Sequence, residues 1–415
     1  MRKNEIIRSF FILLMISLFP ITIIQKPAVC ISYNYQIMEN IPDFKPLNMS
    51  EEILMGAIFY SWWGDLLLIE NFHWDQGISI TPKWGQYNSI DQTIVRKQIK
   101  TAQQYGIDFF AVCWFGSTNR AACRENRLGL ESGLLDSEWV NEIRFCIFYE
   151  LISLLMHPQF SSINKTQMIL DDFRYMCENY FNLPNYLTLN NRPVVFMYES
   201  YSIDSLIDLE NALNASRKVC VEYGYSPFII GDLVRPTIPS TNLFDLFDGA
   251  TTYAFNLNPS WTNVIQAMEE YYPLWLNTCQ NQQKLFIPAV YPGFNDTGFE
   301  VSSGRILTRD LEKFNQTLNI GKETMDPDHK IVTVFSWNEY HEATAIEPTK
   351  EDGCTFLEIV NKYSSSYGNI SNMNNTSDES IAPLQTSTTD KTTPVSLLVC
   401  SLVIIPIFRR KVKKK

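Results

Sequence analysis

The stretch Ile331-Val332-Thr333-Val334-Phe335-Ser336-Trp337-Asn338-Glu339-Tyr340-His341-Glu342 joins a continuous apolar run to a cluster of polar and aromatic side chains. A continuous run of this length is typical of a strand that is buried on both faces, as in a parallel sheet covered by helices. The cluster then follows directly after the carboxyl end of that strand. We therefore expect this stretch to decide both the fold and the position of the functional site.

Apolar or aromatic runs of the same kind recur along the chain before this stretch, and with it they number eight. They cover residues 53–60, 107–114, 145–150, 194–198, 227–231, 247–253, 285–290 and 331–337. The segments between them are amphipathic, as in 91–105, where apolar residues recur at helical spacing before Gly106, which fits a helix C-cap. Eight alternating strand and helix units predict an α/β fold, a single (β/α)8 TIM-type barrel over residues 50–362.

Functional groups of such barrels gather at the carboxyl ends of the strands. Polar and aromatic side chains stand at or just after the ends of all eight runs, namely Trp62, Trp63, Trp114, Glu150, Glu199, Asp232, Tyr253, Tyr291, Asn338 and Glu339. Any one of them is explained by a strand that simply ends in an amphipathic residue. Their recurrence at every run favours a functional cleft at this face of the barrel.

Glu339 and Glu342 place two carboxylates three residues apart at the end of the last run. Cleavage of a glycosidic bond needs such a pair, because one carboxyl protonates the leaving oxygen and the other acts as base or nucleophile. Two carboxylates held close together also raise the pKa of one of them, which favours the acid role near neutral pH. The spacing alone is equally typical of a solvated helix face.

The composition excludes several classes of function. A net charge of −11 and a pI near 5.0 would repel phosphate backbones, so we expect no nucleic-acid partner. The chain has four histidines, no zinc-binding spacing, no Gly-rich phosphate loop and no dinucleotide fingerprint, so we expect neither a metal nor a cofactor. Aromatic residues make up 13% of the chain, which supplies enough rings to line a binding cleft as well as a core.

The two ends of the chain carry localisation signals. Basic residues precede an apolar run within residues 1–30, which predicts a signal peptide or an N-terminal anchor. Residues 363–394 are rich in Ser, Thr and Asn and predict a linker, and residues 395–415 are a hydrophobic segment with a basic tail. We therefore expect an extracytoplasmic, cell-surface monomer that is attached to the membrane through its terminal hydrophobic segments.

Residues 336–348 resemble the last-strand signature of glycoside hydrolase family 99, the endo-α-mannosidase and endo-α-mannanase family, in which Asn-Glu-Trp-His-Glu is followed by Ile-Glu-Pro. Other segments agree in the same order, namely 56–63 with His73-Trp74, 85–87 before Asp91, 106–108 leading to Trp114, 192–194 leading to Tyr198, 248–249 before Tyr253, and 292–297. The resemblance extends from about residue 54 to residue 348. It implies a (β/α)8 barrel that hydrolyses α-mannosidic or related α-glycosidic linkages in an oligosaccharide or polysaccharide substrate.

The resemblance also implies separate roles for the two carboxylates. Glu339 matches the residue that takes the proton from the substrate 2-hydroxyl, so that this oxygen attacks the anomeric carbon. Glu342 matches the acid that protonates the leaving sugar and then activates water, which retains the anomeric configuration in an endo-acting enzyme. The matching substrate-binding residues are Tyr60, His73, Trp74, Trp114, Tyr198, Tyr253, Asn338 and His341, and His341 is equally compatible with a packed residue that holds Glu339.

Four positions depart from the family pattern. Its Trp is Tyr340 here, its Gly is Ala343, its Gln is Ala345, and Glu199 stands where an Asp is usual. Both carboxylates remain, so the departures bear on the sugar and linkage more than on the reaction type. The alternative is a non-hydrolytic glycan-binding or polysaccharide-assembly protein of the WbsX-like type, because a fold does not by itself decide a function.

Overall fold

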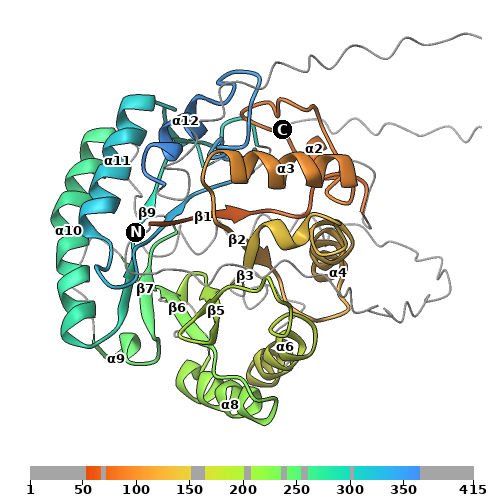
Figure 1. The fold of residues 1–415 in the computed structure, drawn as a ribbon, viewed down its shortest axis with the longest axis vertical. Coiled ribbons are helices and arrows are strands. Elements are labelled where there is room, and N and C mark those ends of the chain that lie inside the picture. Colours follow the sequence, from red (N-terminus) through yellow and green to blue (C-terminus); the bar gives the residue numbers. More distant parts are fainter. Residues whose placement is uncertain are drawn as a thin grey trace, which may run out of the picture. The chain divides into compact units, whose positions relative to one another are not determined.

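In the computed structural model the parallel strands of the barrel form one ring (Figure 1). The structure describes residues 53–66, 72–150, 164–200, 207–234, 241–253, 260–299 and 303–364. Around the ring the strands are β1 (Leu54–Phe59), β2 (Phe109–Trp114), β3 (Arg144–Tyr149), β5 (Arg192–Met197), β6 (Phe228–Asp232), β7 (Gly249–Thr251), β8 (Leu285–Ile287) with β9 (Ala289–Val290), and β12 (Ile331–Val334). Each overlaps one of the eight predicted runs, and β3, β5 and β6 extend one or two residues beyond theirs. The predicted TIM-type barrel is confirmed.

The ring closes through a single segment of chain, residues 285–290. β8 pairs with β7 and β9 pairs with β12, both in parallel. Pro288 separates the two short strands because it has no backbone N–H for the ladder, yet its carbonyl still accepts a hydrogen bond of 3.0 Å from Thr333 N. The last gap in the sheet is therefore bridged by one bent strand.

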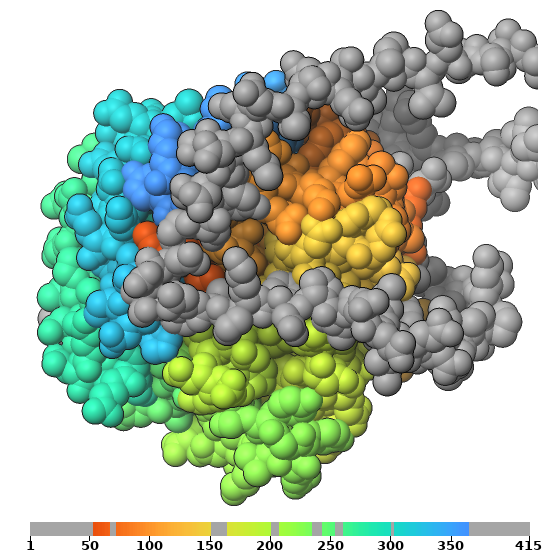
Figure 2. All heavy atoms as spheres, in the orientation of Figure 1, coloured from red at the N-terminus to blue at the C-terminus, as the bar shows by residue number. Residues whose placement is uncertain are grey.

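Helices cover the outside of the ring. They are α2 (Phe72–Asp75), α3 (Gln92–Gln104), α4 (Ala121–Leu128), α6 (Lys165–Asn179), α8 (Leu209–Glu222), α9 (Thr241–Phe244), α10 (Trp261–Asn281), α11 (Leu311–Thr324) and α12 (Thr355–Asn361). A π-helix (Gly129–Leu134), a 3-10 helix (Val140–Glu142) and the short strands β4 (Thr188–Leu189), β10 (Phe294–Asn295) and β11 (Ile306–Leu307) complete the described elements. Figure 2 shows one face of the molecule, on which the segments follow one another around the ring in sequence order, as expected for a barrel.

Four of the outer helices begin with the same local signal. The side chains of Asp91, Asn164, Asp208 and Asp310 each accept a hydrogen bond from a backbone N–H in the first turn of α3, α6, α8 and α11, respectively. Such a cap satisfies a donor that the helix itself cannot pair. α3 ends as the sequence predicts, at Gly106, whose φ of 76° is costly for other residues.

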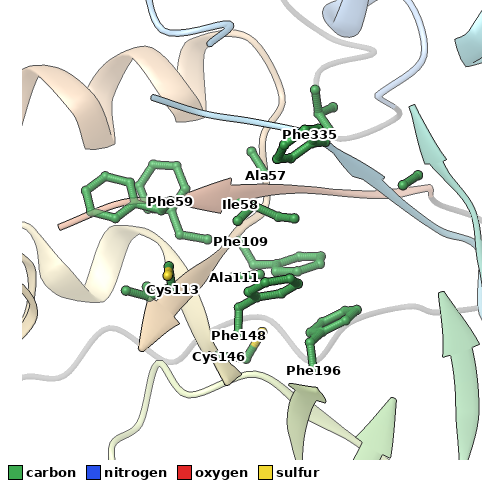
Figure 3. Packing of buried hydrophobic residues seen from close by; sticks show 14 of the residues in the cluster. Ala57, Ile58, Phe59, Phe109, Ala111, Cys113, Cys146, Phe148, Phe196 and Phe335 are labelled. Atoms are coloured by element: carbon green, nitrogen blue, oxygen red, sulfur yellow. The ribbon is translucent and has the colours of Figure 1, made fainter. Parts of the chain in front are cut away.

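The interior of the barrel is filled by side chains from alternate positions of the strands. Phe109, Phe148 and Phe196, from three neighbouring strands, lie close together in this interior (Figure 3). Gly56 makes room for Phe109, because a Cβ at Gly56 would lie 2.1 Å from the Phe109 ring. The alternation that brings these rings inward turns the residues between them toward the helices.

The terminal segments that the sequence assigns to a signal, a linker and a hydrophobic tail lie outside the described residues, except for residues 363 and 364. Their boundaries stay predictions. Among the described residues, no helix is both long enough and apolar enough to cross a membrane.

Candidate active site

The segment that carries both carboxylates folds back on itself directly after β12. Ser336 N donates to Thr344 O over 3.0 Å, Ile346 N donates to Ser336 O over 3.0 Å, and Glu347 N donates to Trp337 O over 2.8 Å. We call residues 336–347 the catalytic loop. Because both ends of this loop are bonded to each other, Glu339 and Glu342 are held within one short, closed turn.

Side chains inside and outside the catalytic loop hold its turn in place. Ser336 Oγ accepts a hydrogen bond of 2.9 Å from Glu339 N, and it is also bonded to Thr344 Oγ1 at 2.8 Å. Arg309 donates to Ala343 O over 2.8 Å and forms an ion pair of 2.7 Å with Asp352. The turn is therefore fixed from within and from α11's side of the barrel.

The two carboxylates differ in their surroundings. Glu339 is buried, and its Oε1 accepts a hydrogen bond of 2.9 Å from His341 N, with the Glu342 N–H as a second backbone donor to the side chain. The Oε2 atom of Glu342 is enclosed and has no hydrogen-bond partner in the protein. Donors stabilise a carboxylate, whereas an enclosed oxygen without donors favours the acid. The pair therefore carries its negative charge best on Glu339 and its proton best on Glu342.

Burial shifts the titration of the pair. Burial raises the pKa of Glu342 to about 8, with Arg305 opposing the shift and Asp296 and Glu150 adding to it. Burial and then the charge of Glu342 raise the pKa of Glu339, and its two backbone donors oppose that shift. Two such groups titrate as a pair. Acid–base catalysis needs one protonated and one ionised carboxyl, and the raised pKa of Glu342 favours the protonated form of that group near neutral pH.

Three of the predicted binding tyrosines line the same space as the carboxylates. The hydroxyls of Tyr60 and Tyr253 are hydrogen-bonded to each other, and the Tyr198 ring lies 4.6 Å from the Tyr253 ring. Burial, followed by the charge of Glu339, raises the pKa of Tyr60 well above its usual range. Tyr253 is positioned by buried Asp232, which accepts a hydrogen bond of 3.1 Å from Tyr253 N. Burial raises the pKa of Tyr253 as well, so the hydroxyls of Tyr60 and Tyr253 stay protonated, and the one that accepts their shared bond can donate to a ligand.

The two predicted histidines lie together on another side of the catalytic loop. Their ring centres are 6.0 Å apart, and His73 Nε2 lies 3.5 Å from Glu125 Oε2. Burial lowers the pKa of His341 to about 3, so its ring is neutral. With His341 Nδ1 bonded to Gly77 O at 2.7 Å, Nε2 is the acceptor, and this buried atom has no protein partner. His341 can therefore accept a hydrogen bond from a ligand hydroxyl.

Three of the predicted binding residues contact other parts of the protein and support the site from behind. Trp114 is fully buried and points outward to Tyr175 on α6 and to Tyr180, because β2 alternates and the neighbouring Cys113 takes the inward direction. Trp74 is enclosed, stacks 4.1 Å from Trp63 and donates its indole N–H to a backbone carbonyl.

Asn338 is the third supporting residue. Its Oδ1 accepts from Tyr60 N over 2.7 Å, and its Nδ2 donates to Tyr60 O over 2.9 Å and to Tyr87 Oη over 3.1 Å. The side chain is fully buried and its amide is used in these bonds. Asn338 therefore positions Tyr60.

Three charged groups that act on the pair, Glu150, Asp296 and Arg305, are absent from the site residues assigned from the sequence. Glu150 follows β3, accepts a hydrogen bond of 3.1 Å from Cys113 Sγ and acts electrostatically on both carboxylates. Its position at the end of a run was the signal that could have identified it. Arg305 lies beside β10 on a segment without a recognisable pattern, so no sequence signal pointed to it.

The site can thus transfer protons near neutral pH and present hydroxyl and imidazole groups to a polyhydroxylated ligand. Within the described ranges, no group of three or more His, Cys, Asp or Glu side chains is arranged to hold a metal ion. The chemistry that the residues themselves support is acid–base catalysis by the pair Glu339 and Glu342.

Comparisons with known proteins agree with this geometry. A family model described as Glycosyl hydrolase family 99 matches residues 66–368. The glycoprotein endo-alpha-1,2-mannosidase of Mus musculus is 23% identical over 349 residues, which cover 74% of this chain and 70% of that protein. The protein of the same name from Rattus norvegicus is 23% identical over 380 residues, which cover 79% of this chain and 77% of that protein.

Solved structures share the fold. A glycoside hydrolase-like protein superimposes with a TM-score of 0.62 at 18% identity, covering 78% of this chain and 96% of that one. The GH99 endo-alpha-mannosidase from Bacteroides thetaiotaomicron, in complex with BIS-TRIS-propane, superimposes with a TM-score of 0.55 at 21% identity, covering 74% of this chain and 95% of that one.

Proposed function

The chain belongs to glycosyl hydrolase family 99 and is a glycosidase, and from this premise we propose that it cleaves α-mannosidic linkages within glycans or mannans, with retention of configuration. The observation that carries the proposal is the unequal environment of the two carboxylates in the catalytic loop. Glu339 receives backbone donors and Glu342 has an enclosed, unpaired oxygen. The pair is therefore prepared to act as one base and one acid.

In the first step Glu339 takes the proton from the 2-hydroxyl of the substrate. The 2-oxygen attacks the anomeric carbon while the bond to the leaving oxygen breaks and Glu342 protonates that oxygen, which yields a 1,2-anhydro sugar. A nucleophile within the substrate has the high effective concentration of an intramolecular group. In an α-mannoside the 2-hydroxyl lies on the face opposite the leaving oxygen, so the geometry of this sugar suits the step.

In the second step Glu342, now ionised, takes a proton from water, and the water oxygen attacks the anomeric carbon. The bond to the 2-oxygen breaks, and Glu339 returns its proton to that oxygen. Two inversions give net retention, and both carboxyls end as they began. The raised pKa of Glu342, about 8, suits a group that must be an acid first and a base later.

The lining residues support a polyhydroxylated substrate. Tyr198 and Tyr253 offer ring faces and hydroxyls, and the neutral imidazole of His341 offers an acceptor. Endo action fits the names of the curated relatives, which are endo-mannosidases. The sugar and linkage within this class depend on the residues around Tyr340 and Ala343, where the chain departs from the family pattern.

The test is release of reducing ends from α-1,2- and α-1,3-linked mannan oligosaccharides by the full-length chain. Proton NMR of the first products should show the α-anomer before mutarotation, as retention requires. Glu342→Gln is the matched control and should release little product. If wild type and variant are equally inert on a broad glycan panel while both bind glycan, the chain is a non-hydrolytic glycan-binding protein and the proposal fails.

We also propose that the enzyme acts outside the cytoplasm as a membrane-attached monomer. The support is in the sequence alone, in the apolar runs within residues 1–30 and 395–415. Fractionation of expressing cells, with protease added to intact cells, tests this location. Recovery of all activity in the cytoplasmic fraction would contradict it.

A further inference from the structure

Glu347, at the end of the catalytic loop, is a buried carboxylate that the proposed reaction does not use. Its side chain is buried, with an exposed fraction of 1%. Its Oε1 accepts hydrogen bonds of 2.7 Å from Gln98 Nε2 and 3.0 Å from Trp337 Nε1. Its Oε2 accepts from the hydroxyls of Tyr87, at 3.0 Å, and Tyr340. Each of its oxygens therefore has two donors.

The donors connect Glu347 to the residues of the site. Trp337 and Tyr340 are on the catalytic loop, on either side of Glu339 in the sequence, and both bond to the same carboxylate. Tyr87 accepts a hydrogen bond from Asn338, which holds the backbone of Tyr60. Glu347 thus joins the catalytic loop to Tyr60, which directly follows β1.

Burying a carboxylate in this way costs free energy, so the arrangement calls for a role that an apolar residue could not fill. Removing a carboxylate from water carries a large free-energy cost, which its hydrogen-bond donors offset only in part. Burial raises the pKa of Glu347 to about 7, against the opposing effect of its four donors. An apolar residue would fill the same volume without this cost. What an apolar residue could not do is fix Trp337, Tyr340 and Tyr87 in one mutual geometry.

We infer that Glu347 is a positioning residue for catalysis, which holds Glu339 and Glu342 in register with Tyr60 through Trp337, Tyr340 and Tyr87. The inference rests on the proposed function, since it assumes that this pair is catalytic. Glu347 touches no substrate. Its effect is on where the reacting carboxyls stand, and a displacement of about 1 Å in such groups can cost about 100-fold in rate.

The experiment compares Glu347→Leu with Glu347→Gln in the full-length chain. Leu keeps the volume but removes all four acceptor bonds, so kcat on α-mannan oligosaccharides should fall about 100-fold while KM changes by less than about threefold. Gln keeps an oxygen that accepts from Gln98 and Trp337, and the hydroxyl of Tyr340 can rotate to accept from its amide, so most of the network remains. Glu347→Gln should therefore recover most of kcat.

Asp172 provides the matched control. It is also a fully buried carboxylate, and it accepts hydrogen bonds from Tyr149 and Ser117. Asp172→Asn should lower the melting temperature but leave kcat unchanged. If Glu347→Leu loses only stability, as Asp172→Asn does, and keeps the kcat of wild type, Glu347 is merely structural and the inference is overturned.

A crystallographic comparison separates this inference from the proposed function. If wild type hydrolyses none of the α-mannans, the proposed function fails, and structures of wild type and Glu347→Leu still judge the positioning. The inference requires a displacement of residues 336–347 in the variant and is overturned if both carboxyls stay in place. Should Glu347→Leu not fold, Tyr87→Phe keeps the ring and removes one link, and it should lower kcat about 10-fold with KM unchanged.

Discussion

Arg309 Nη1 donates a hydrogen bond of 2.8 Å to the carbonyl oxygen of Ala343, in the turn that directly follows Glu342. Ala343 has a φ of 52°, in the left-handed region that favours glycine, and it is buried. The bond from Arg309, itself fixed by Asp352, holds this turn at a conformation that alanine adopts at a cost of about 1–2 kcal/mol. The turn that orients Glu342 is therefore under local backbone strain.

Replacing Ala343 by Gly should stabilise the protein. Gly adopts a positive φ without a Cβ clash, and its greater freedom in the unfolded chain offsets part of this gain. We expect the free energy of unfolding of Ala343→Gly to rise by about 0.5–1 kcal/mol, measured by urea denaturation. Ala345→Gly is the control. Ala345 is equally buried and has no positive φ, so this variant should have a lower free energy of unfolding than wild type. Equal destabilisation of both variants would contradict the strain.

The pair should give the stability a specific dependence on pH. The pKa of Glu342 rises from its usual 4.5 to about 8 in the folded state, so the folded protein binds this proton more tightly than the unfolded chain. That contribution is complete below pH 4.5 and is lost as the pH rises through 8. Between these values each such group lowers the free energy of unfolding by about 1.4 kcal/mol per pH unit.

Glu342→Gln should remove this contribution. We expect the variant to have a slope that is smaller by about 1.4 kcal/mol per pH unit between pH 5.5 and 7.5, measured by urea denaturation at each pH. Asp172, whose pKa burial raises to about 6, provides a comparison, because Asp172→Asn should change the slope only below that value. A slope for Glu342→Gln identical to that of wild type would show that this carboxyl is ionised throughout the range.

The different roles of the two carboxylates should be visible in the leaving-group dependence. With an aryl α-mannoside whose leaving group needs little protonation, Glu342→Gln should lose much less of the first-step rate than it loses with mannan oligosaccharides. Glu339→Gln should lose about 100- to 10,000-fold with both substrates, because removal of the 2-hydroxyl proton is needed in each case. Single-turnover release of the aryl group measures the first step. Equal losses for both variants on both substrates would reject the assignment.

The barrel itself could be predicted from the sequence because strands buried on both faces must be apolar along their length. That requirement produced the continuous runs, and even the bent strand at Pro288 lay within one of them. The position of Glu339 and Glu342 followed, since they come after the last run. What the runs could not reveal is the direction of a side chain at a strand end, which is set by the pleat and by the register with neighbouring strands.

The network around Glu347 could not be predicted for a different reason. Its partners come from two segments that are far apart in the sequence, Tyr87 and Gln98 from one and Trp337 from the other, and each side chain alone is compatible with many surroundings. Likewise, the strained φ of Ala343 follows from the closure of the catalytic loop and not from any local pattern. Contacts between distant segments depend on the assembled barrel.

Trp114 and Tyr253 should respond in opposite ways to conservative substitution. Trp114, the last residue of β2, packs against Tyr175 on α6. Trp114→Phe should therefore lower the free energy of unfolding by about 1–2 kcal/mol and leave kcat/KM unchanged. Tyr253 faces the carboxylates and shares a hydrogen bond with Tyr60, so Tyr253→Phe should lower kcat/KM about 10-fold or more at little cost in stability. Urea denaturation and initial rates on the same preparations provide both measurements. A loss of kcat/KM in Trp114→Phe that exceeds that in Tyr253→Phe would show that Trp114 belongs to the binding site.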